Sequence, residues 1–446
     1  MRSSSDINHN IWRLAWPMII SNLSVPILGL VDTAILGHLE DAQFLVAVAI
    51  GSSILSFLYW GFGFLRMGTT GFAAQAYGAE QHNHSRLIIG QSLILGLVLG
   101  LSVVCLSPML LSVGLSLIVP PMGSGELAAS YVQIRIFSAP AVLMNYAIIG
   151  WMIGHQNTRW PLIIMLFTNS INLALDFLLI VGLDMNSDGA AIATLIAEYS
   201  GCGLALYLLK RQLHRRPGSL DIQSLLRWQD YRELIVVNRH LFVRTLILLA
   251  SFAFFTAQGA KQGEVIVAAN VILIHLLTLT AFGMDGFAHA AEAMVGAAVG
   301  KKDGKLFLSV CYHSAFWSLV TALAFTLLFL IAGPAIIGLL TSIAAVKAAA
   351  IQYLPWLLVL PLISVWGYLF DGIFIGATQT AAMQTTMIYA ATLVYLPTWY
   401  FGQYWGNHGL WFALIAFNAA RGLFLGFCFY RFNQQQRWWR AAAGND

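Results

Sequence analysis

The segment LFLSVCYHSAFWSLVTALAFTLLFLIAGPAIIGL, residues 306–339, contains no aspartate, glutamate, lysine or arginine. A helix needs roughly 20 apolar residues to cross the hydrocarbon core of a bilayer, so this segment can span a membrane with some tilt. The rest of the chain has the same character. It is 59% hydrophobic and 9% charged, whereas a soluble domain carries roughly 25% charged residues. The sequence predicts an integral membrane protein.

Further apolar segments lie on both sides of this one, and we count twelve in all. They are 14–37, 44–69, 86–111, 127–153, 160–183, 189–209, 236–258, 265–298, 306–339, 348–375, 382–403 and 408–431. The sequence therefore predicts an all-α polytopic membrane protein with twelve transmembrane helices.

The distribution of lysine and arginine predicts the orientation. With the N-terminus in the cytoplasm, the outer loops hold only Lys261 and Lys347, and all other basic residues of the loops and termini lie on the cytoplasmic side. Such an excess marks cytoplasmic loops. We expect a multi-pass protein of a cell inner membrane with both termini in the cytoplasm. This also accounts for the net charge of +4 without a nucleic-acid partner.

The chain repeats itself at a nearly constant offset. The matched positions are Gly78 with Gly300, Gly154 with Gly376, Pro140 with Pro361, and Gly189 with Gly409. Each half holds six spans, so both enter the membrane from the same side. We predict an N-lobe (1–209), a cytoplasmic linker (210–232) and a C-lobe (233–446), related by a pseudo-twofold axis around a central cleft. Rocking two such lobes would give alternating access, which favours a transporter.

Sequence features of an enzyme are missing. The four cysteines lie in apolar stretches without a Cys-x-x-Cys spacing, so we expect no disulfide, metal site or cofactor. No Walker loop and no Gly-x-Ser-x-Gly elbow occurs. We therefore predict a protein that is not an enzyme and is driven by an ion gradient or by the gradient of its substrate.

Charges inside the spans need a reason, because each costs at least a few kcal/mol in the bilayer. Asp32 lies in the first span, which Pro17 and Pro26 interrupt. Proline removes a backbone donor and can kink a helix. A bendable helix carrying a protonatable carboxyl is one interpretation, and a carboxylate fixed in a static hydrogen-bond network is the other.

The fifth and sixth spans carry polar rows. Asn169, Asn172 and Asp176 share one face of the fifth span, and Thr194 and Glu198 are four apart in the sixth. Such rows either line a cavity or hold helices together. The carboxylates favour a cavity.

The C-lobe differs, since its first span has Arg244 and no acid, and its fourth span carries Asp371. We expect these two residues to form a structural ion pair, because an unpaired buried charge is far costlier than a paired one. Asp285, His289 and Glu292 in the eighth span have no assigned role.

The first span and three shorter motifs resemble the multidrug and toxic compound extrusion (MATE) family, and especially its DinF-like branch. They are LAWPMIISNLSVPILGLVDTAILGHL (14–39), Gly154 to Thr158 with its repeat at Gly376 to Thr380, Asn172 to Asp176, and Asp188 to Thr194. The resemblance covers nearly the whole chain. It implies two six-helix lobes around a cleft and the export of small lipophilic, often cationic compounds in exchange for protons or sodium ions.

Residue roles follow from the same resemblance. It implies ion coupling at Asp32, Asn172, Asp176 and Thr194, bending of the first helix at Pro17, to which we add Pro26, and a cavity position for Tyr131 and Asn145. We place Asn22, Asn169 and Glu198 in the same substrate cavity.

The coupling ion is either a proton or a sodium ion. The sodium-coupled branch of the family pairs a glutamate of the seventh helix with an aspartate of the tenth, whereas this chain has Arg244 and Asp371 in those helices. We therefore favour protons, although the four N-lobe coupling residues offer enough oxygens for sodium. Rival interpretations are a flippase for lipids or lipid-linked precursors and a membrane-embedded enzyme. We expect a monomer in contact with membrane lipid.

Overall fold

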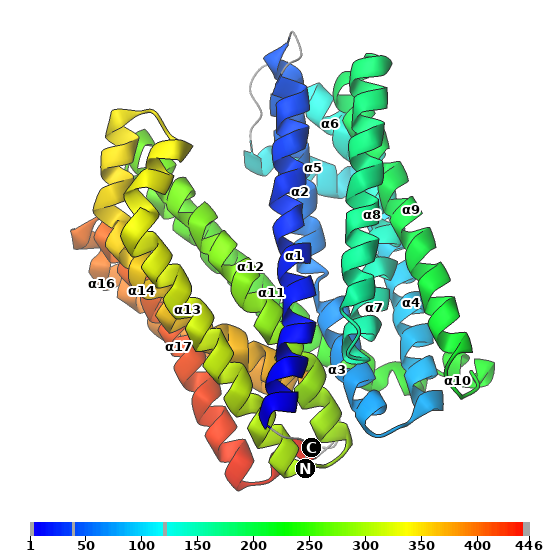
Figure 1. Cartoon of the computed structure of the whole chain (residues 1–446). Coiled ribbons are helices and arrows are strands. Elements are labelled where there is room, and N and C mark those ends of the chain that lie inside the picture. Colours follow the sequence, from blue (N-terminus) through cyan, green and yellow to red (C-terminus); the bar gives the residue numbers. More distant parts are fainter. Residues whose placement is uncertain (1–3, 38–40, 119–122, 440–446) are drawn as a thin grey trace. The chain divides into compact units, whose positions relative to one another are not determined.

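The computed structural model describes residues 4–37, 41–118 and 123–439, and these form helices joined by turns, without a β-strand (Figure 1). The long helices are α1 (Ser4–Gly37), α2 (Ala42–Gly61), α3 (Phe64–Gly78), α4 (His82–Cys105), α6 (Ser124–Arg135), α7 (Ala139–Gly154), α8 (Arg159–Asp176), α9 (Asn186–His214), α11 (Arg232–Ala260), α12 (Glu264–Gly300), α13 (Gly304–Leu340), α14 (Ala344–Gly376) and α17 (Asn407–Gln434). The remaining helices are α5 (Ser107–Ile118), α10 (Ile222–Leu226), α15 (Thr380–Tyr389) and α16 (Leu396–Gly402).

The predicted spans correspond to helical stretches of the structure. Ten stretches of the described residues are long and apolar enough to cross a membrane. The first predicted span falls on α1, and the eleventh falls on α15 and α16, which a π-helical segment, η4 (Ala390–Tyr395), joins. The all-α, multi-span prediction is confirmed. Some boundaries differ, since the second predicted span is broken between α2 and α3 and continues to Gly78.

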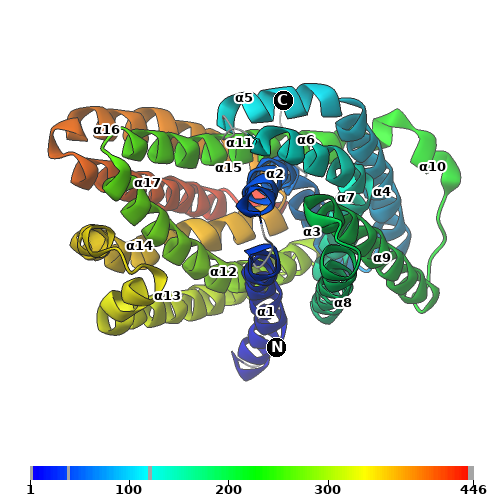
Figure 2. The same cartoon turned by 90° about the horizontal axis from the view of Figure 1, so that it is seen from above.

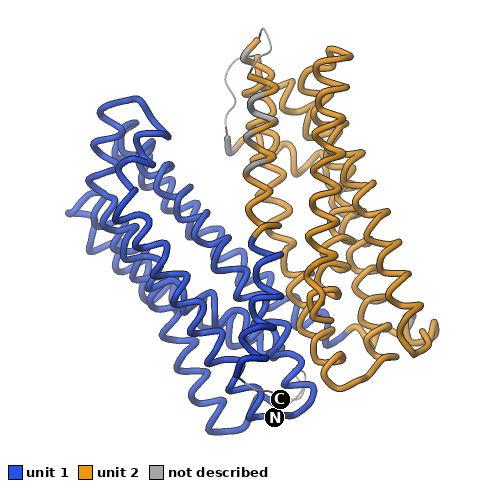
Figure 3. Tube along the Cα trace, in the orientation of Figure 1, with its two compact units in different colours: residues 1–19, 232–446 blue, residues 20–231 orange. Residues whose placement is uncertain are grey.

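The chain divides into two compact units (Figure 3). Unit 1 comprises residues 1–19 and 232–446, and unit 2 comprises residues 20–231. The division at 231/232 lies at the end of the predicted linker. Residues 1–19 group with the C-terminal half, whereas we expected them in the N-lobe. Helix α1 therefore begins in one unit and ends in the other.

Aromatic contacts hold the start of α1 in unit 1. The ring of Trp12 lies 5.2 Å from that of Phe287 in α12 and 5.0 Å from that of Trp317 in α13. The indole nitrogen of Trp317 also donates to the side-chain oxygen of Asn8 at 3.0 Å. Edge-to-face aromatic pairs contribute about 0.5–1.5 kcal/mol beyond their buried area, so this end of α1 is well fixed.

Both halves contain the same close helix crossing. In unit 2, a Cβ atom added to Gly154 of α7 would meet Ala73 and Ala74 of α3 at 2.7 and 2.8 Å. In unit 1, a Cβ atom on Gly376 of α14 would collide with the backbone of Glu292 in α12. Only glycine lets the backbones approach this closely. Gly154 and Gly376 are one of the matched pairs of the sequence repeat, so the two crossings support the predicted duplication.

The turns after these helices repeat as well. Glu80 and Lys302 have φ of 58° and 55°, and Gln156 and Thr378 have φ of 57° and 54°. The two members of each pair occupy equivalent positions in the repeat. After each of them the next amide bonds back five residues, at 2.9 to 3.1 Å, which is the hydrogen bond of a Schellman helix ending. The repeat seen in a few glycines thus extends to backbone conformation.

Within unit 2, α7 is the central helix. It packs against α3 and α4 on one side and α9 on the other, and Figure 2 shows these helices beside one another. Trp151 of α7 is fully buried there and donates from its indole nitrogen to the hydroxyl of Ser85 in α4, at 3.0 Å. Helix α9 also packs against α6 and α8, and the polar rows lie on α8 and α9.

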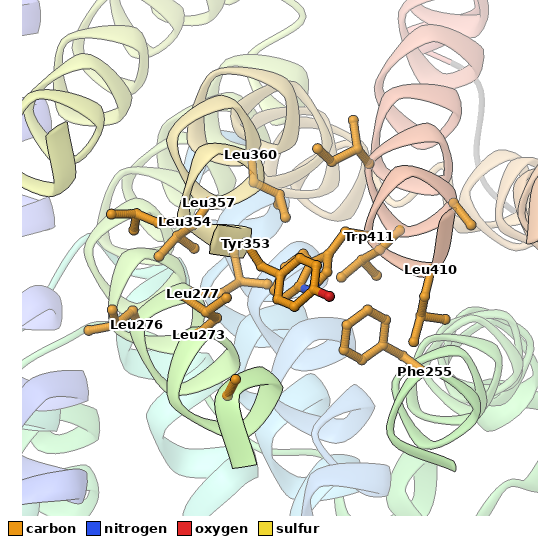
Figure 4. Close-up of a cluster of buried hydrophobic side chains, with 14 of the residues drawn as sticks. Phe255, Leu273, Leu276, Leu277, Tyr353, Leu354, Leu357, Leu360, Leu410 and Trp411 are labelled. Carbon is orange, nitrogen blue, oxygen red and sulfur yellow. The ribbon is translucent and has the colours of Figure 1, made fainter. Parts of the chain in front are cut away.

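Unit 1 has its own hydrophobic core between α11, α12, α14 and α17 (Figure 4). Phe255 and Trp411 pack edge to face there, with ring centroids 5.0 Å apart. One polar group is embedded, and it is satisfied: Asn270 and Asn407 exchange hydrogen bonds of 2.8 and 2.9 Å, and Trp411 donates to Asn270 at 2.9 Å. Buried polar groups that are fully bonded in this way fix helix register.

Candidate ion-coupling site

The polar row of α8 meets α9 at a hydrogen bond. The side-chain nitrogen of Asn172 donates to the hydroxyl of Thr194 at 3.2 Å, and that hydroxyl donates to the carbonyl of Ala190 at 3.0 Å. Asn172 is 2% exposed. Its side-chain oxygen accepts no hydrogen bond from any residue that the structure describes. That oxygen can accept a hydrogen bond from water or from a protonated group, or it can coordinate a cation.

Asp176 lies one turn beyond Asn172 and is 1% exposed. It is the last residue of α8 before a π-helical segment, η2 (Phe177–Gly182). Single π-helical turns inside helices are rare and are frequent at functional sites. The widened turn therefore begins at the predicted coupling carboxyl.

The row also connects to α1. The side-chain nitrogen of Asn169 donates to the hydroxyl of Ser24 at 3.2 Å, and Ser24 donates to the carbonyl of Ser21 at 2.7 Å. The hydroxyl of Ser21 points to the sulfur of Met165, 3.0 Å away. These contacts join α1 to α8 in the stretch between the two prolines. Pro17 is buried and Pro26 is exposed.

Asp32, the coupling residue predicted in the first span, lies in α1, but its side chain is not among those that the structure describes. Asn22 is partly buried in α1, one residue from Ser21. Of the predicted coupling set, the structure brings Asn172 and Thr194 into direct contact and places Asp176 on the next turn of the same helix.

A second polar group lies between α2, α6 and α9. A guanidinium nitrogen of Arg135 donates to the hydroxyl of Tyr131 at 3.0 Å, and the hydroxyls of Tyr59 and Ser138 are 3.1 Å apart. Glu198 is partly exposed and interacts electrostatically with Arg135 and Tyr59. The sequence analysis selected Tyr131 and Glu198 but gave no role to Arg135. Its charge within the predicted span 127–153 was the signal that could have identified it.

Asn145, also expected in the cavity, lies in α7 and is 7% exposed. Its side-chain oxygen accepts no hydrogen bond from the part of the chain that the structure describes. No hydrogen bond among these residues links it to Asn172 or Thr194, so the cavity assignment of Asn145 stays a prediction.

The ion pair expected in the C-lobe is present, with a third member that we did not predict. Arg244 of α11 donates to Oδ2 of Asp371 in α14, and Arg421 of α17 donates to the same oxygen at 3.0 Å. Arg421 also donates to Asn418 at 3.2 Å. All three ionic residues are at most 7% exposed. Asp285 interacts electrostatically with Tyr368, and Tyr368 also interacts with all three members of this ionic group.

The family model named MatE matches this chain twice, at residues 17–178 and 241–401. The chain belongs to the MatE family. The second match begins at nearly the position that the offset of the repeated glycines predicts from the first. As a member of this MATE family, the chain is a multi-pass membrane transporter and not an enzyme, which confirms both predictions.

Relatives along the whole length agree with this assignment. DNA damage-inducible protein F of Escherichia coli is 40% identical over 97% of this chain and 94% of its own, in keeping with the DinF-like branch. A probable multidrug resistance protein NorM of Acinetobacter baylyi is 25% identical over 95% of this chain and 96% of its own.

Solved structures share the fold. An outward-facing multidrug resistance MATE family transporter superposes with a TM-score of 0.87 at 20% identity, covering 96% of each chain. A MATE transporter of Vibrio cholerae superposes with a TM-score of 0.86 at 21% identity, covering 98% of this chain and 99% of its own. These neighbours support the two-lobe MATE fold.

Proposed function

We propose that this transporter exports lipophilic, often cationic compounds in exchange for protons, as a monomer in a cell inner membrane with both termini in the cytoplasm. Multidrug resistance in the names of relatives supports the substrate class. The observation that carries the coupling proposal is the polar row of α8. It bears the buried Asp176 and hydrogen-bonds both to α9 through Asn172 and to α1 through Asn169.

The proposed cycle uses that connection. Asp32 takes up a proton from outside, and the loss of its charge changes its interactions with α8 and α9. Helix α1 then bends near Pro17 and Pro26, which shrinks the N-lobe cavity around Tyr131 and Glu198 and releases substrate. The lobes rock, the proton leaves to the cytoplasm, and the deprotonated form binds the next cation. The proton and the substrate thus compete for the transporter. Linkage makes this competition reciprocal, because a proton that weakens substrate binding must itself be bound more weakly when substrate is present.

The ionic group in the C-lobe argues against sodium coupling through Asp371. A sodium ion at Asp371 would have to displace guanidinium groups, because Oδ2 of that carboxylate already accepts from Arg244 and Arg421. A carboxylate shared by two buried cations is a poor ligand for a third. We therefore propose coupling through the N-lobe residues Asp32, Asn172, Asp176 and Thr194.

The test is transport of ethidium in proteoliposomes, with a pH gradient and a sodium gradient imposed separately. We expect the pH gradient alone to drive transport by the wild type and Asp32→Asn to abolish it. The matched control is Asp303→Asn, at the exposed N-cap of α13, where the carboxylate bonds the amide of Leu306. This variant is expected to transport like the wild type.

Three other results would change the proposal. Transport driven only by sodium would overturn proton coupling and would favour a sodium site at the four N-lobe coupling residues. If neither gradient moves the dye, the efflux proposal fails and the lipid flippase is favoured, which would then be tested with fluorescent phospholipids in the same vesicles. If a gradient drives transport but Asp32→Asn equals the wild type, the role of Asp32 in coupling is excluded.

A further inference from the structure

The linker after α9 runs along the edge of unit 2 and is fastened to α4. Arg86 donates to the carbonyls of Leu213 and Arg216 at 2.6 and 2.9 Å, and the amide of Ser219 donates to Asn83 at 2.9 Å. Further along, Gln91 donates to the carbonyl of Asp230 at 3.2 Å. Figure 2 shows α10 at the periphery of this unit, beyond α4 and α9.

These contacts fix the depth of the linker relative to the membrane. Leu225 packs on Gly90, where an added Cβ would come within 2.7 Å of its side chain. Gly90 lies eight residues after the start of α4 at His82, which is about 12 Å along the helix axis. The apolar run of α4 has already begun there, at Leu87. The linker therefore lies level with the membrane boundary and not out in the cytoplasm.

Apolar side chains of the linker point away from the protein at this depth. Leu220, Ile222 and Trp228 are 42%, 68% and 76% exposed. Trp228 stacks on Tyr231, with ring centroids 6.2 Å apart, and the hydroxyl of Tyr231 donates to the carbonyl of Leu225. Tryptophan and tyrosine are the residues enriched at membrane–water interfaces. This surface, the linker patch, comprises Leu220, Ile222 and Trp228.

Basic residues flank the linker patch in the sequence. Residues 210–231 contain five lysines and arginines and two aspartates. Lys210, Arg211, Arg215 and Arg227 are exposed. One aspartate, Asp221, is engaged as the N-cap of α10, where it accepts from Gln223 and Ser224. Clusters of exposed basic residues next to a membrane span attract anionic lipid headgroups.

We propose that the linker patch is a docking surface for anionic phospholipids of the cytoplasmic leaflet. Ile222 and Trp228 enter the interface, and the guanidinium groups of Arg215 and Arg227 bind headgroup phosphates. Because the segment is hydrogen-bonded to α4 and also leads into α11, it ties the end of the N-terminal half to the lipid surface. The proposal does not depend on the coupling ion or the substrate.

The test uses the full chain with a nitroxide label at Trp228→Cys, in a variant whose four native cysteines are replaced by alanine. The protein is reconstituted in phosphatidylcholine alone or mixed in equal parts with phosphatidylglycerol. We expect the probe to be more accessible to oxygen than to an aqueous nickel chelate. This difference in accessibility should be larger in the vesicles that contain phosphatidylglycerol. Adding Arg215→Gln and Arg227→Gln is expected to weaken the preference for the anionic lipid on the order of tenfold.

A label at Trp405→Cys is the matched control. Trp405 is 65% exposed, and its short segment, residues 403–406, contains no basic residue. Its accessibility should be the same in both vesicles. A Trp228 probe that is aqueous in both vesicles would overturn the proposal. A probe that inserts equally well with and without phosphatidylglycerol would overturn the anionic part and leave an uncharged interfacial contact.

Discussion

Asp371 is the residue whose replacement should cost most stability, because its carboxylate binds two buried arginines. In Asp371→Asn, Arg244 and Arg421 remain buried without a counter-charge on that side chain. Breaking a buried ion pair on one side typically costs about 3–5 kcal/mol. We expect a strong decrease in the thermal unfolding temperature of the purified protein, against little change in Asp303→Asn. Wild-type stability in Asp371→Asn would mean that the arginines have other partners.

Thr194 provides a finer probe of the coupling site. Thr194→Val removes the oxygen that accepts from Asn172 but keeps the shape of the side chain. A hydrogen bond contributes about 1 kcal/mol net, so we expect proton-driven transport to fall roughly fivefold. Thr194→Ser keeps the hydroxyl and should restore the rate. Equal activity of the valine and serine variants would contradict a role for this bond.

His155, in the turn between α7 and α8, predicts a pH dependence of stability. Burial, aided by the charge of Arg216, lowers its pKa to about 3, from about 6.5 in an unfolded chain. The imidazole is held neutral between Ser85 and the carbonyl of Trp151. Between these two pKa values the unfolded chain binds the extra proton, so stability is lost as the pH falls from about 6.5 towards about 3.

The measurement compares thermal unfolding of the wild type and His155→Gln across this pH range. The variant should lose less stability on acidification, because glutamine has no proton to gain. The maximum difference in slope is about 1.4 kcal/mol per pH unit. Parallel curves for the two proteins would show that His155 is already protonated when folded.

At the scale of elements, the prolines of α1 are expected to serve movement and not stability. Pro17→Ala and Pro26→Ala each restore a backbone donor to the helix. We expect both variants to fold at least as well as the wild type and to transport more slowly. Pro334→Ala in α13 is the control, since that proline lies inside a helix with no assigned role in transport. Unchanged rates in the α1 variants would exclude bending at these positions.

Runs of apolar residues predicted the helices well and their irregularities poorly. The twelve spans followed from runs of apolar residues, which report burial in lipid directly. The π-helical segment after Asp176 and the break between α2 and α3 were not predicted, because both depend on how neighbouring helices pack. The predicted span 86–111 is similarly divided between α4 and α5.

The candidate site was predictable where its residues share one helix. Asn172 and Asp176 are four apart, so their common face could be read from spacing alone. The role of Arg421 could not be predicted from spacing, because its partner Asp371 lies 50 residues away on another helix. The cost of a buried charge indicates that each intramembrane arginine needs an acidic partner, but it does not identify that partner.

At the scale of the whole molecule, the orientation can be tested by labelling. We expect a membrane-impermeant maleimide to reach Lys261→Cys, in the turn between α11 and α12, in intact cells. Asp303→Cys, in the turn between α12 and α13, should react only after lysis, because Lys301 and Lys302 mark that turn as cytoplasmic. The protein with its four native cysteines alone gives the background. The opposite labelling pattern would show that the chain has the opposite orientation in the membrane.

With the proposed bend at Pro17, helix α1 would act as a lever, because its start belongs to unit 1 and its end to unit 2. From Pro17 to Gly37 the arm is about 30 Å long at about 1.5 Å per residue. A proline kink of about 20° would swing its tip by about 10 Å, and Ser24, nearer the fulcrum, by about 4 Å. The smaller displacement already exceeds the 3.2 Å that separates Ser24 from Asn169. A modest bend would therefore release α1 from α8 in one movement.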